Sequence, residues 1–335
     1  MDLTVVIPTY NRRALLADAV ASLRRQTHPA DRYELLIISD GSTDGSDDDY
    51  ATPLTGPATR LVRQEKRGFG LSRARNLGAR LAAGRLVMFF DDDMVAEPGL
   101  VAAHVAAHAR FGAEVAVIGQ VRLSPKVPAT PFCRIVLGDV CGRYEGRPDE
   151  ARFLEFGNAL SWQTSFKREA LLNLGGYDDG YSAYGWEDIE FSYRATRSGW
   201  RFYYEPAAVS LHNDQRQTLS AHGARLRTAS RMAPLLFAQY PGLAAQIPMY
   251  ADKGPIVWGQ DRLGLVARKL ARQLLATRPV MAGLEALTPW VERLAPEPAL
   301  RRWYYGLLGS YVLRGYREGL AAGPDPRVPA AQPVA

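Results

Sequence analysis

The sequence has few cysteines and no long apolar run. Its 335 residues include only Cys133 and Cys141, which are too few for a disulfide framework and lack the spacing of a metal-binding pair. We therefore expect reduced thiols, with an incidental disulfide as the alternative. No stretch approaches 18 consecutive apolar residues, which argues against a membrane-spanning helix. The first residues, with Asp2 and a short apolar run, do not resemble a signal peptide, so we expect a cytoplasmic protein.

The composition also excludes several protein classes. Hydrophobic residues make up 47% of the chain and charged residues 23%, as in ordinary globular proteins, so collagen-like, coiled-coil and disordered classes are excluded. The length predicts two folding units, or one large domain with an appendage. The net charge of +6 is uneven, because residues 216–320 contain 15 Lys and Arg against 6 Asp and Glu. This asymmetry indicates a separate basic C-terminal region.

The first half of the chain alternates between strand and helix patterns. Apolar runs at 3–7, 35–38 and 86–90 are typical of buried strands, and helical periodicity appears at 15–23 and 72–82. Such alternation predicts a parallel sheet covered by helices, with ligands beyond the carboxyl ends of the strands.

Prolines and polar residues predict where these elements begin and end. We expect Pro8 to end the first strand, Pro206 to end a later strand that begins at Arg201, and Asn11 to cap the helix that follows the first strand. After residue 222 the pattern is helical but is interrupted by repeated prolines. We therefore expect short helices in that region.

Acidic residues follow two of the predicted strands. Asp40 comes after the second run, and Asp91, Asp92 and Asp93 come directly after the run at 86–90. Three adjacent carboxylates repel one another and raise one another's pKa, and a divalent cation relieves that repulsion. Oxygen ligands favour Mg²⁺ or Mn²⁺ over zinc. The alternative is a solvated turn whose acids cap the next helix.

Six short segments occur in the order and at the spacing typical of a known enzyme family. They are VVIPTYN (5–11), ISDGSTD (38–44), Gly70 with ARNLG (74–78), GRL (84–86), FDDD (90–93) and GWED (185–188). Together they resemble the family-2 glycosyltransferases of GT-A fold. The resemblance covers about residues 1 to 215 and implies an α/β, Rossmann-like, mostly parallel sheet flanked by helices. The helical pattern after residue 222 adds an α-helical C-terminal extension to this fold.

The resemblance, together with the charge asymmetry and the helical pattern that follow it, predicts a domain organisation. Residues 1–215 would form the catalytic domain, with a nucleotide-sugar-binding half at 1–120 and an acceptor-binding half at 121–215. A helical basic region would follow at 216–322, and we expect a disordered tail at 323–335 because it is rich in proline and alanine.

The resemblance implies a nucleotide-diphosphate-sugar donor, with a UDP-sugar as the expected choice. The residues that would bind it are Pro8, Thr9, Tyr10, Asn11, Asp40, Arg67, Gly70, Arg75, Asn76, Asp91 and Asp92. A divalent cation, Mn²⁺ or Mg²⁺, would be held by Asp93, Asp91 and His212. An Asx-turn is the alternative for Asp40, an exposed helix face for Arg67, and a structural role for His212.

Two acids match the acceptor side of the family pattern. Asp188 would be the base that deprotonates the acceptor hydroxyl, and Glu187 would orient the acceptor. Their alternative role is to complement the dipole of the helix that they begin. Attack by the acceptor in a single displacement implies inversion, and no second nucleophile suggests retention. The Gln-x-x-Arg-Trp signature of processive members is absent from the sequence, so we expect the addition of single sugars.

The basic C-terminal region combines arginines with leucines, as do interfacial helices on anionic lipid. It predicts peripheral contact with the inner face of the plasma membrane. The alternative is packing on the catalytic domain or on another subunit of a homo-oligomer. A nucleic-acid partner is not expected, because the bases concentrate after Arg216 rather than throughout the folded part.

The sequence thus predicts a metal-dependent inverting glycosyltransferase that adds one sugar to a saccharide or lipid-linked acceptor in the synthesis of cell-surface polysaccharide, glycolipid or glycoconjugate. Two alternatives remain at this stage. A sugar nucleotidyltransferase would need a glycine-rich triphosphate loop, which residues 8–11 do not form. A non-catalytic lipid-surface or nucleic-acid-binding protein would account for the pI near 9.3.

Overall fold

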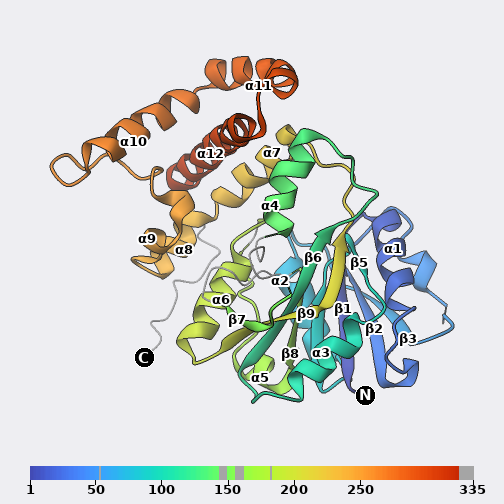
Figure 1. The fold of residues 1–335 in the computed structure, drawn as a ribbon. Helices are drawn as coiled ribbons and strands as arrows, with labels where there is room; N and C mark the ends of the chain where they lie inside the picture. The colour runs from blue at the N-terminus through green and yellow to red at the C-terminus, as the bar shows by residue number, and fades with distance from the viewer. Residues whose placement is uncertain (53, 143–148, 155–161, 182, 324–335) are drawn as a thin grey trace. The chain divides into compact units, whose positions relative to one another are not determined.

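The computed structural model describes residues 1–52, 54–142, 149–154, 162–181 and 183–323 (Figure 1). Apart from Gly323, the predicted disordered tail lies outside these described residues. The chain forms two compact units: the first comprises Met1–Pro128, Leu137–Ser182 and Glu187–Arg216, and the second comprises Ala129–Val136, Ala183–Trp186 and Gln217–Ala335.

The first unit is built on a mixed sheet whose strand order is β3-β2-β1-β4-β8-β6-β9-β5, with β7 paired to β9. Strands β1 to β4 are parallel, as the sequence predicts, whereas β8 runs antiparallel to β4 and β6. The strands are β1 Leu3–Thr9, β2 Tyr33–Ser39, β3 Ala58–Arg63, β4 Leu86–Phe90, β5 Met94–Ala96, β6 Val115–Leu123, β7 Arg152–Leu154, β8 Gln163–Lys167 and β9 Arg201–His212.

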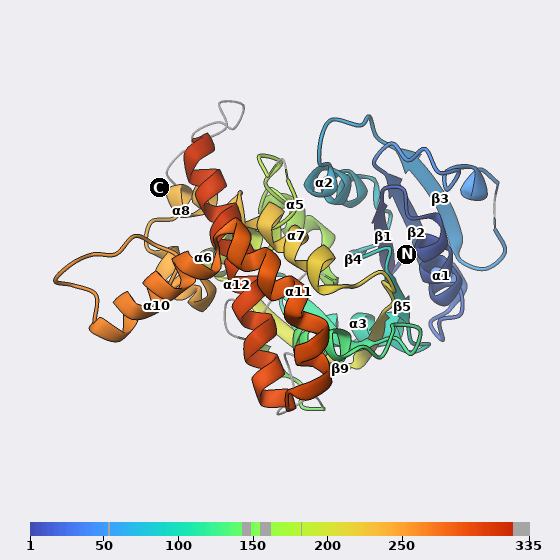
Figure 2. The ribbon, with the colours of Figure 1, turned by 90° about the horizontal axis from the view of Figure 1, so that it is seen from above.

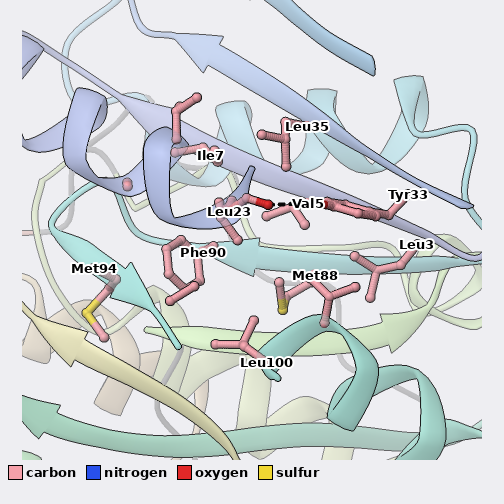
Figure 3. Packing of buried hydrophobic residues seen from close by; sticks show 14 of the residues in the cluster. Leu3, Val5, Ile7, Leu23, Tyr33, Leu35, Met88, Phe90, Met94 and Leu100 are labelled. Atoms are coloured by element: carbon pink, nitrogen blue, oxygen red, sulfur yellow. Dashed lines mark hydrogen bonds between the residues drawn. The ribbon is translucent and has the colours of Figure 1, made fainter. Parts of the chain in front are cut away.

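Helices cover both faces of this sheet. One face carries α1 (Arg13–Leu23) and α3 (Leu100–His108), and the other carries α2 (Leu71–Leu81), α5 (Arg168–Asn173) and α6 (Glu187–Arg197). Alternate side chains of a strand point to opposite faces. Leu3, Val5 and Ile7 of β1 therefore pack with α1 and α3 (Figure 3), whereas Val6 packs with α2, α5 and α6. A short helix, α4 (Gly138–Cys141), follows a π-helical turn at Cys133–Leu137.

Two prolines lie inside strands, so the prediction that each ends its strand is wrong. β1 continues through Pro8 to Thr9, where it pairs with β2 alone, because its pairing with β4 stops at Val6. β9 continues through Pro206, which falls in a bulge where the pairing with β6 shifts register. In both places the missing N–H interrupts no ladder of hydrogen bonds.

Asn11 does not cap α1, contrary to the prediction. Its backbone is left-handed, with φ of 52°, and its side-chain Oδ1 accepts a hydrogen bond of 2.7 Å from the backbone N–H of Thr43. The cap comes instead from Asp44, whose Oδ2 accepts from the N–H of Arg13 at 2.9 Å. The loops after β1 and β2 meet because neighbouring parallel strands end at the same edge of the sheet.

A buried polar cluster ties α3 to the sheet. The hydroxyl of Ser165 on β8 lies 2.7 Å from His104 Nδ1 and 2.9 Å from His108 Nε2. Burial lowers the pKa of His104 to about 4 and that of His108 to about 3. Both imidazoles are therefore neutral at pH 7, and the cluster is a structural link between helix and strand.

The second unit consists mainly of helices (Figure 2). They are α7 Leu219–Ser230, α8 Ala233–Gln239, α9 Leu243–Gln246, α10 Leu263–Leu275, α11 Arg278–Leu294 and α12 Glu297–Ala322. α12 packs closely on α7: a Cβ on Gly315 would lie 2.0 Å from the carbonyl oxygen of Arg227, so only glycine fits there. Both cysteines are free, as predicted, and both are buried. Within the described ranges, no helix has the length and apolar character needed to cross a membrane.

The prediction of short helices is wrong for the last two, because several prolines begin helices rather than break them. α11 has 17 residues and α12 has 26. Pro279 and Pro298 lie in their first turns, where the missing N–H has no helical partner in any case. Pro289 lies inside α11, whose inner face is held by side-chain contacts with α12.

Candidate active site

Asp40 follows β2 and is buried among polar partners. Its carboxylate accepts hydrogen bonds from Gln64 Nε2 at 2.6 Å and from Lys66 Nζ at 2.5 Å, while an Arg73 nitrogen lies 3.8 Å away. Lys66 Nζ also lies 3.6 Å from the ring centre of Tyr10, a half-exposed residue that follows β1. Lys66 therefore bridges the Asp40 carboxylate and the Tyr10 ring at the carboxyl edge of the sheet.

Gly70 fixes the position of this carboxylate. It precedes α2, and a Cβ at this residue would lie 2.2 Å from Asp40 Oδ1. A contact below 3 Å forces one of the two groups to move, and the short Asp40 side chain has little freedom to do so. The absence of a side chain at Gly70 thus allows α2 to begin directly against Asp40.

The three acids after β4 have different partners. Arg75 Nη2 lies 3.3 Å from Asp91. Asp92 accepts a hydrogen bond of 2.7 Å from the Thr9 hydroxyl, and Arg12 Nη1 lies 3.1 Å from Asp92 and 2.7 Å from Asp93. Burial raises the pKa of Asp91 and Asp92 well above the usual value for aspartate, and the neighbouring carboxylates add to the rise although the arginines oppose it. The three carboxylates therefore carry more negative charge than Arg12 and Arg75 neutralise.

His212 lies next to Asp93 because β5 and β9 pair antiparallel. Met94 is opposite His212 in the register, and the backbone N–H of Asn213 donates to the carbonyl of Asp93 at 2.7 Å. His212 Nε2 is 3.9 Å from Asp93 Oδ2. The other ring nitrogen, Nδ1, is buried and has no hydrogen-bond partner among the described residues.

Asp91, Asp93 and His212 have side chains that commonly bind divalent cations. The part of the chain that the structure describes contains no preformed cluster of three or more metal ligands. Two ligand atoms of one ion can lie at most about 4.2 Å apart when each bond is about 2.1 Å. The separation of 3.9 Å between His212 and Asp93 is within that limit. The carboxylates of Asp91 and Asp93 with the His212 imidazole form a donor set that suits Mn²⁺ or Mg²⁺.

Arg75 connects the acids after β4 with the acids that begin α6. Its guanidinium is fully buried and lies 3.3 Å from Asp91 on one side and 3.3 Å from Glu187 Oε1 on the other. Burial and the neighbouring Asp188, opposed by Arg75, raise the pKa of Glu187 to about 7. Glu187 Oε2 is buried without a hydrogen-bond partner among the described residues.

Left-handed backbone precedes Glu187. Gly185 has φ of 102° and Trp186 has φ of 75°, and a left-handed conformation is costly for a bulky residue. The Trp186 ring is held in the second unit by Tyr250, with ring centres 5.3 Å apart, and by Phe237, at 6.3 Å. Asp188, the next residue after Glu187, is partly buried and accepts from the N–H of Ile189 at 2.8 Å.

Two residues predicted to bind the donor have other partners in the structure. Arg67 does not join the group around Asp40, because its guanidinium is 71% exposed and pairs with Glu65. The Asn76 amide donates to the carbonyl of Tyr177 at 2.8 Å and to Asp179 at 2.9 Å, and its Oδ1 accepts from the Tyr177 N–H. Asn76 therefore anchors the loop before α6.

Sequence reasoning missed three polar residues of the site, namely Arg12, Gln64 and Lys66. Arg12 pairs with Asp92 and Asp93. Its position directly after β1, next to the VVIPTYN segment, could have indicated that it lies near these acids. Gln64 and Lys66 follow β3, whose carboxyl end adjoins that of β2.

Comparisons with known proteins match this architecture. The family model described as Glycosyl transferase family 2 matches residues 4–171. Validoxylamine A glucosyltransferase of Streptomyces hygroscopicus subsp. jinggangensis (strain 5008) is 31% identical over 218 residues, covering 59% of this chain and 52% of that protein. Chondroitin synthase of Escherichia coli is 28% identical over 239 residues, covering 63% and 34% respectively. The chain thus spans about half or less of the length of these relatives.

A solved structure has a similar fold. The mannosyltransferase PcManGT of Pyrobaculum calidifontis, in complex with GDP-Man and Mn²⁺, is 21% identical with a TM-score of 0.58, covering 94% of this chain and 87% of that one. This likeness confirms the predicted GT-A fold. Because the family model spans half of the chain, the protein belongs to glycosyl transferase family 2.

Proposed function

We propose that this protein transfers one sugar from a nucleotide-diphosphate-sugar to an acceptor hydroxyl, with inversion at the anomeric carbon and with the help of a divalent cation. The observation that carries the proposal is the position of Arg75, which lies between Asp91 and Glu187. A single buried cation thus joins the acids expected to bind the donor to the acids expected to act on the acceptor.

In this proposal the nucleoside lies near Asp40 and Tyr10. The Asp40 carboxylate accepts an N–H from the base, and the Tyr10 ring packs against the base or ribose. The cation would be held by Asp91, Asp93 and His212, and when bound it neutralises the negative charge of the diphosphate leaving group. The structure with GDP-Man and Mn²⁺ supports both a nucleotide-sugar and a divalent cation. We expect a UDP-sugar as the donor.

On the acceptor side, Asp188 removes the proton of the attacking hydroxyl and Glu187 orients the acceptor. Arg75 limits the negative charge that Glu187 and Asp91 place around the diphosphate. The acceptor is a saccharide or a lipid-linked saccharide, and the product belongs to cell-surface polysaccharide, glycolipid or glycoconjugate synthesis. Glycosyltransferase relatives favour sugar transfer over the nucleotidyltransferase alternative.

A screen of nucleotide-sugars tests this function. The full chain is incubated with UDP- and GDP-sugars and Mn²⁺ or Mg²⁺, and released nucleoside diphosphate is measured. We expect release from one donor class, and its loss when EDTA removes the cation. Release that continues at the full rate in EDTA would contradict the metal requirement. Pyrophosphate formation from a nucleoside triphosphate and a sugar 1-phosphate, without nucleotide-sugar turnover, would favour the nucleotidyltransferase.

The role of Asp40 is tested through its neighbour Gly70. We expect Gly70→Ala to weaken nucleoside diphosphate binding about tenfold, because the added Cβ displaces the Asp40 carboxylate, and tenfold in affinity corresponds to about 1.4 kcal/mol. Gly99→Ala is the matched control, since Gly99 also precedes a helix but a Cβ there meets no atom within 4 Å. Calorimetric titration measures both. Equal affinities of the two variants would show that Asp40 does not bind the nucleotide.

A further inference from the structure

Exposed large apolar side chains concentrate in one stretch of the second unit. Among the described residues, eight of them lie between residues 257 and 294, whereas the first unit exposes only three. The eight are Val257, Trp258, Leu263, Leu270, Leu274, Leu287, Trp290 and Leu294. Exposed apolar side chains that share a surface mark an interaction site, whereas scattered single residues do not, so the faces on which these eight lie matter.

α10 presents its apolar stripe away from α12. Leu263, Leu270 and Leu274 are 87%, 50% and 63% exposed, and their spacing of seven and four residues places them on one helix face. The opposite face carries Arg272, whose Nη1 donates to the carbonyl of Gly306 on α12 at 2.6 Å. The stripe is therefore on the outer side of the helix.

α11 repeats this arrangement. Leu287, Trp290 and Leu294 are 53%, 64% and 77% exposed and follow one another at three and four residues. The opposite face bonds to α12: Thr288 accepts from Trp303 Nε1 at 3.0 Å, and Glu292 accepts from the Tyr304 hydroxyl at 2.6 Å. The polar side chains of Thr288 and Glu292 thus face α12, and the opposite, outer face of α11 is apolar.

The exposed charges beside these stripes are positive. The sequence from 262 to 284 contains five Arg and Lys and no Asp or Glu. The two acids of α11, Glu285 and Glu292, bond to tyrosines of α12. The exposed charged side chains of α10, of α11 and of the residue before α10 are Arg262, Arg268, Arg278 and Arg293.

A loop with an exposed tryptophan is bonded to the middle of α10. Asp261 Oδ2 accepts from the N–H of Val257 at 2.9 Å and from Lys269 Nζ at 2.7 Å. These bonds hold the turn that presents Trp258, which is 74% exposed. Tryptophan, like tyrosine, is enriched at the interface between lipid headgroups and acyl chains, and arginine, like lysine, can extend its charged group to it.

We propose that the outer faces of α10 and α11, with Val257 and Trp258, form a docking surface for an anionic lipid bilayer. The apolar stripes enter the headgroup region and the arginines bind lipid phosphates. A second copy of the chain fits this surface less well, because a two-fold contact brings the same patch of each copy together and would oppose its arginines, whereas α10 and α11 as described expose no acid to pair them. This inference does not depend on the transfer reaction.

Vesicle flotation of the full chain tests the docking surface. We expect binding to vesicles of phosphatidylcholine with phosphatidylglycerol, little binding to phosphatidylcholine alone, and loss of binding at 1 M salt, where charges are screened within about 3 Å. Arg268→Glu with Arg278→Glu should weaken binding more than about 25-fold, since each arginine near the surface contributes about fivefold. Leu270→Ser with Trp290→Ser should also weaken it.

The matched controls are Arg317→Glu and Leu320→Ser, which alter an exposed arginine and an exposed leucine of α12. We expect both to bind vesicles like the unaltered chain, and circular dichroism confirms that all variants are folded. Equal binding to neutral vesicles, no binding to anionic vesicles at low salt, or equal loss in the controls would overturn the proposal. So would a dimer in sedimentation that the stripe variants dissociate while vesicle binding is unchanged.

Discussion

Asp188→Asn is expected to lower turnover by about 10²–10⁴-fold, the usual contribution of a general base, while nucleoside diphosphate affinity changes little. Asparagine keeps the size of the side chain and can still accept from the N–H of Ile189, but it cannot take the proton of the acceptor hydroxyl. Steady-state kinetics with the donor found in the screen, together with a nucleotide titration, measures the two quantities separately.

Glu187→Gln is the companion variant. We expect it to raise KM for the acceptor more than it lowers kcat, because in the proposed mechanism Glu187, which is buried against Arg75, orients the acceptor without taking the proton. If Asp188→Asn kept near-normal turnover while Glu187→Gln abolished it, the two roles would be exchanged. The burial of Glu187, which raises its pKa to about 7, would then explain the exchange.

Asp93→Ala is expected to reduce Mn²⁺-dependent nucleotide binding and turnover together, each by more than about 100-fold. Its Oδ2 is the carboxylate oxygen that lies 3.9 Å from His212, and metal and diphosphate bind as a unit when the ion neutralises the leaving group. Calorimetry of nucleoside diphosphate with and without Mn²⁺ measures the binding effect independently of turnover.

Asp48→Ala is the control for Asp93→Ala. Asp48 is an exposed acid in the loop after β2 and lies outside the group that contains Asp93. We expect its loss to leave both measurements unchanged. A variant at Asp93 that still bound nucleotide more tightly with Mn²⁺ than without it would remove Asp93 from the metal site.

The sequence predicted the strands that carry the site because the relevant signals are local. The apolar runs before Asp40 and Asp91 become β2 and β4, and parallel neighbours place their carboxyl ends at one edge. The closeness of Asp93 to His212 depends on antiparallel pairing between β5 and β9, which are far apart along the chain. Periodicity does not report such pairing, and only the resemblance suggested it.

The main error in the predicted site concerned the direction in which side chains point after the end of a strand. Gln64 and Lys66 both reach Asp40, whereas Glu65 and Arg67 pair with each other. Extended backbone sends alternate side chains to opposite sides, so an error of one residue selects Arg67 in place of Lys66. The sequence shows that a cation follows β3, but it does not show which of the two neighbouring cations faces the carboxylate.

The composition of the second unit affects how the chain can be divided. Trp186 and Phe132 belong to that unit, and Phe132 packs on Tyr304 of α12 with ring centres 5.5 Å apart. A chain cut after Arg216 would keep both aromatic residues and lose the helices that bury them. The left-handed backbone of Trp186 would then lack the packing that holds it, and this backbone continues directly into Glu187. The C-terminal helices thus belong to the same compact unit as the segment that leads into α6.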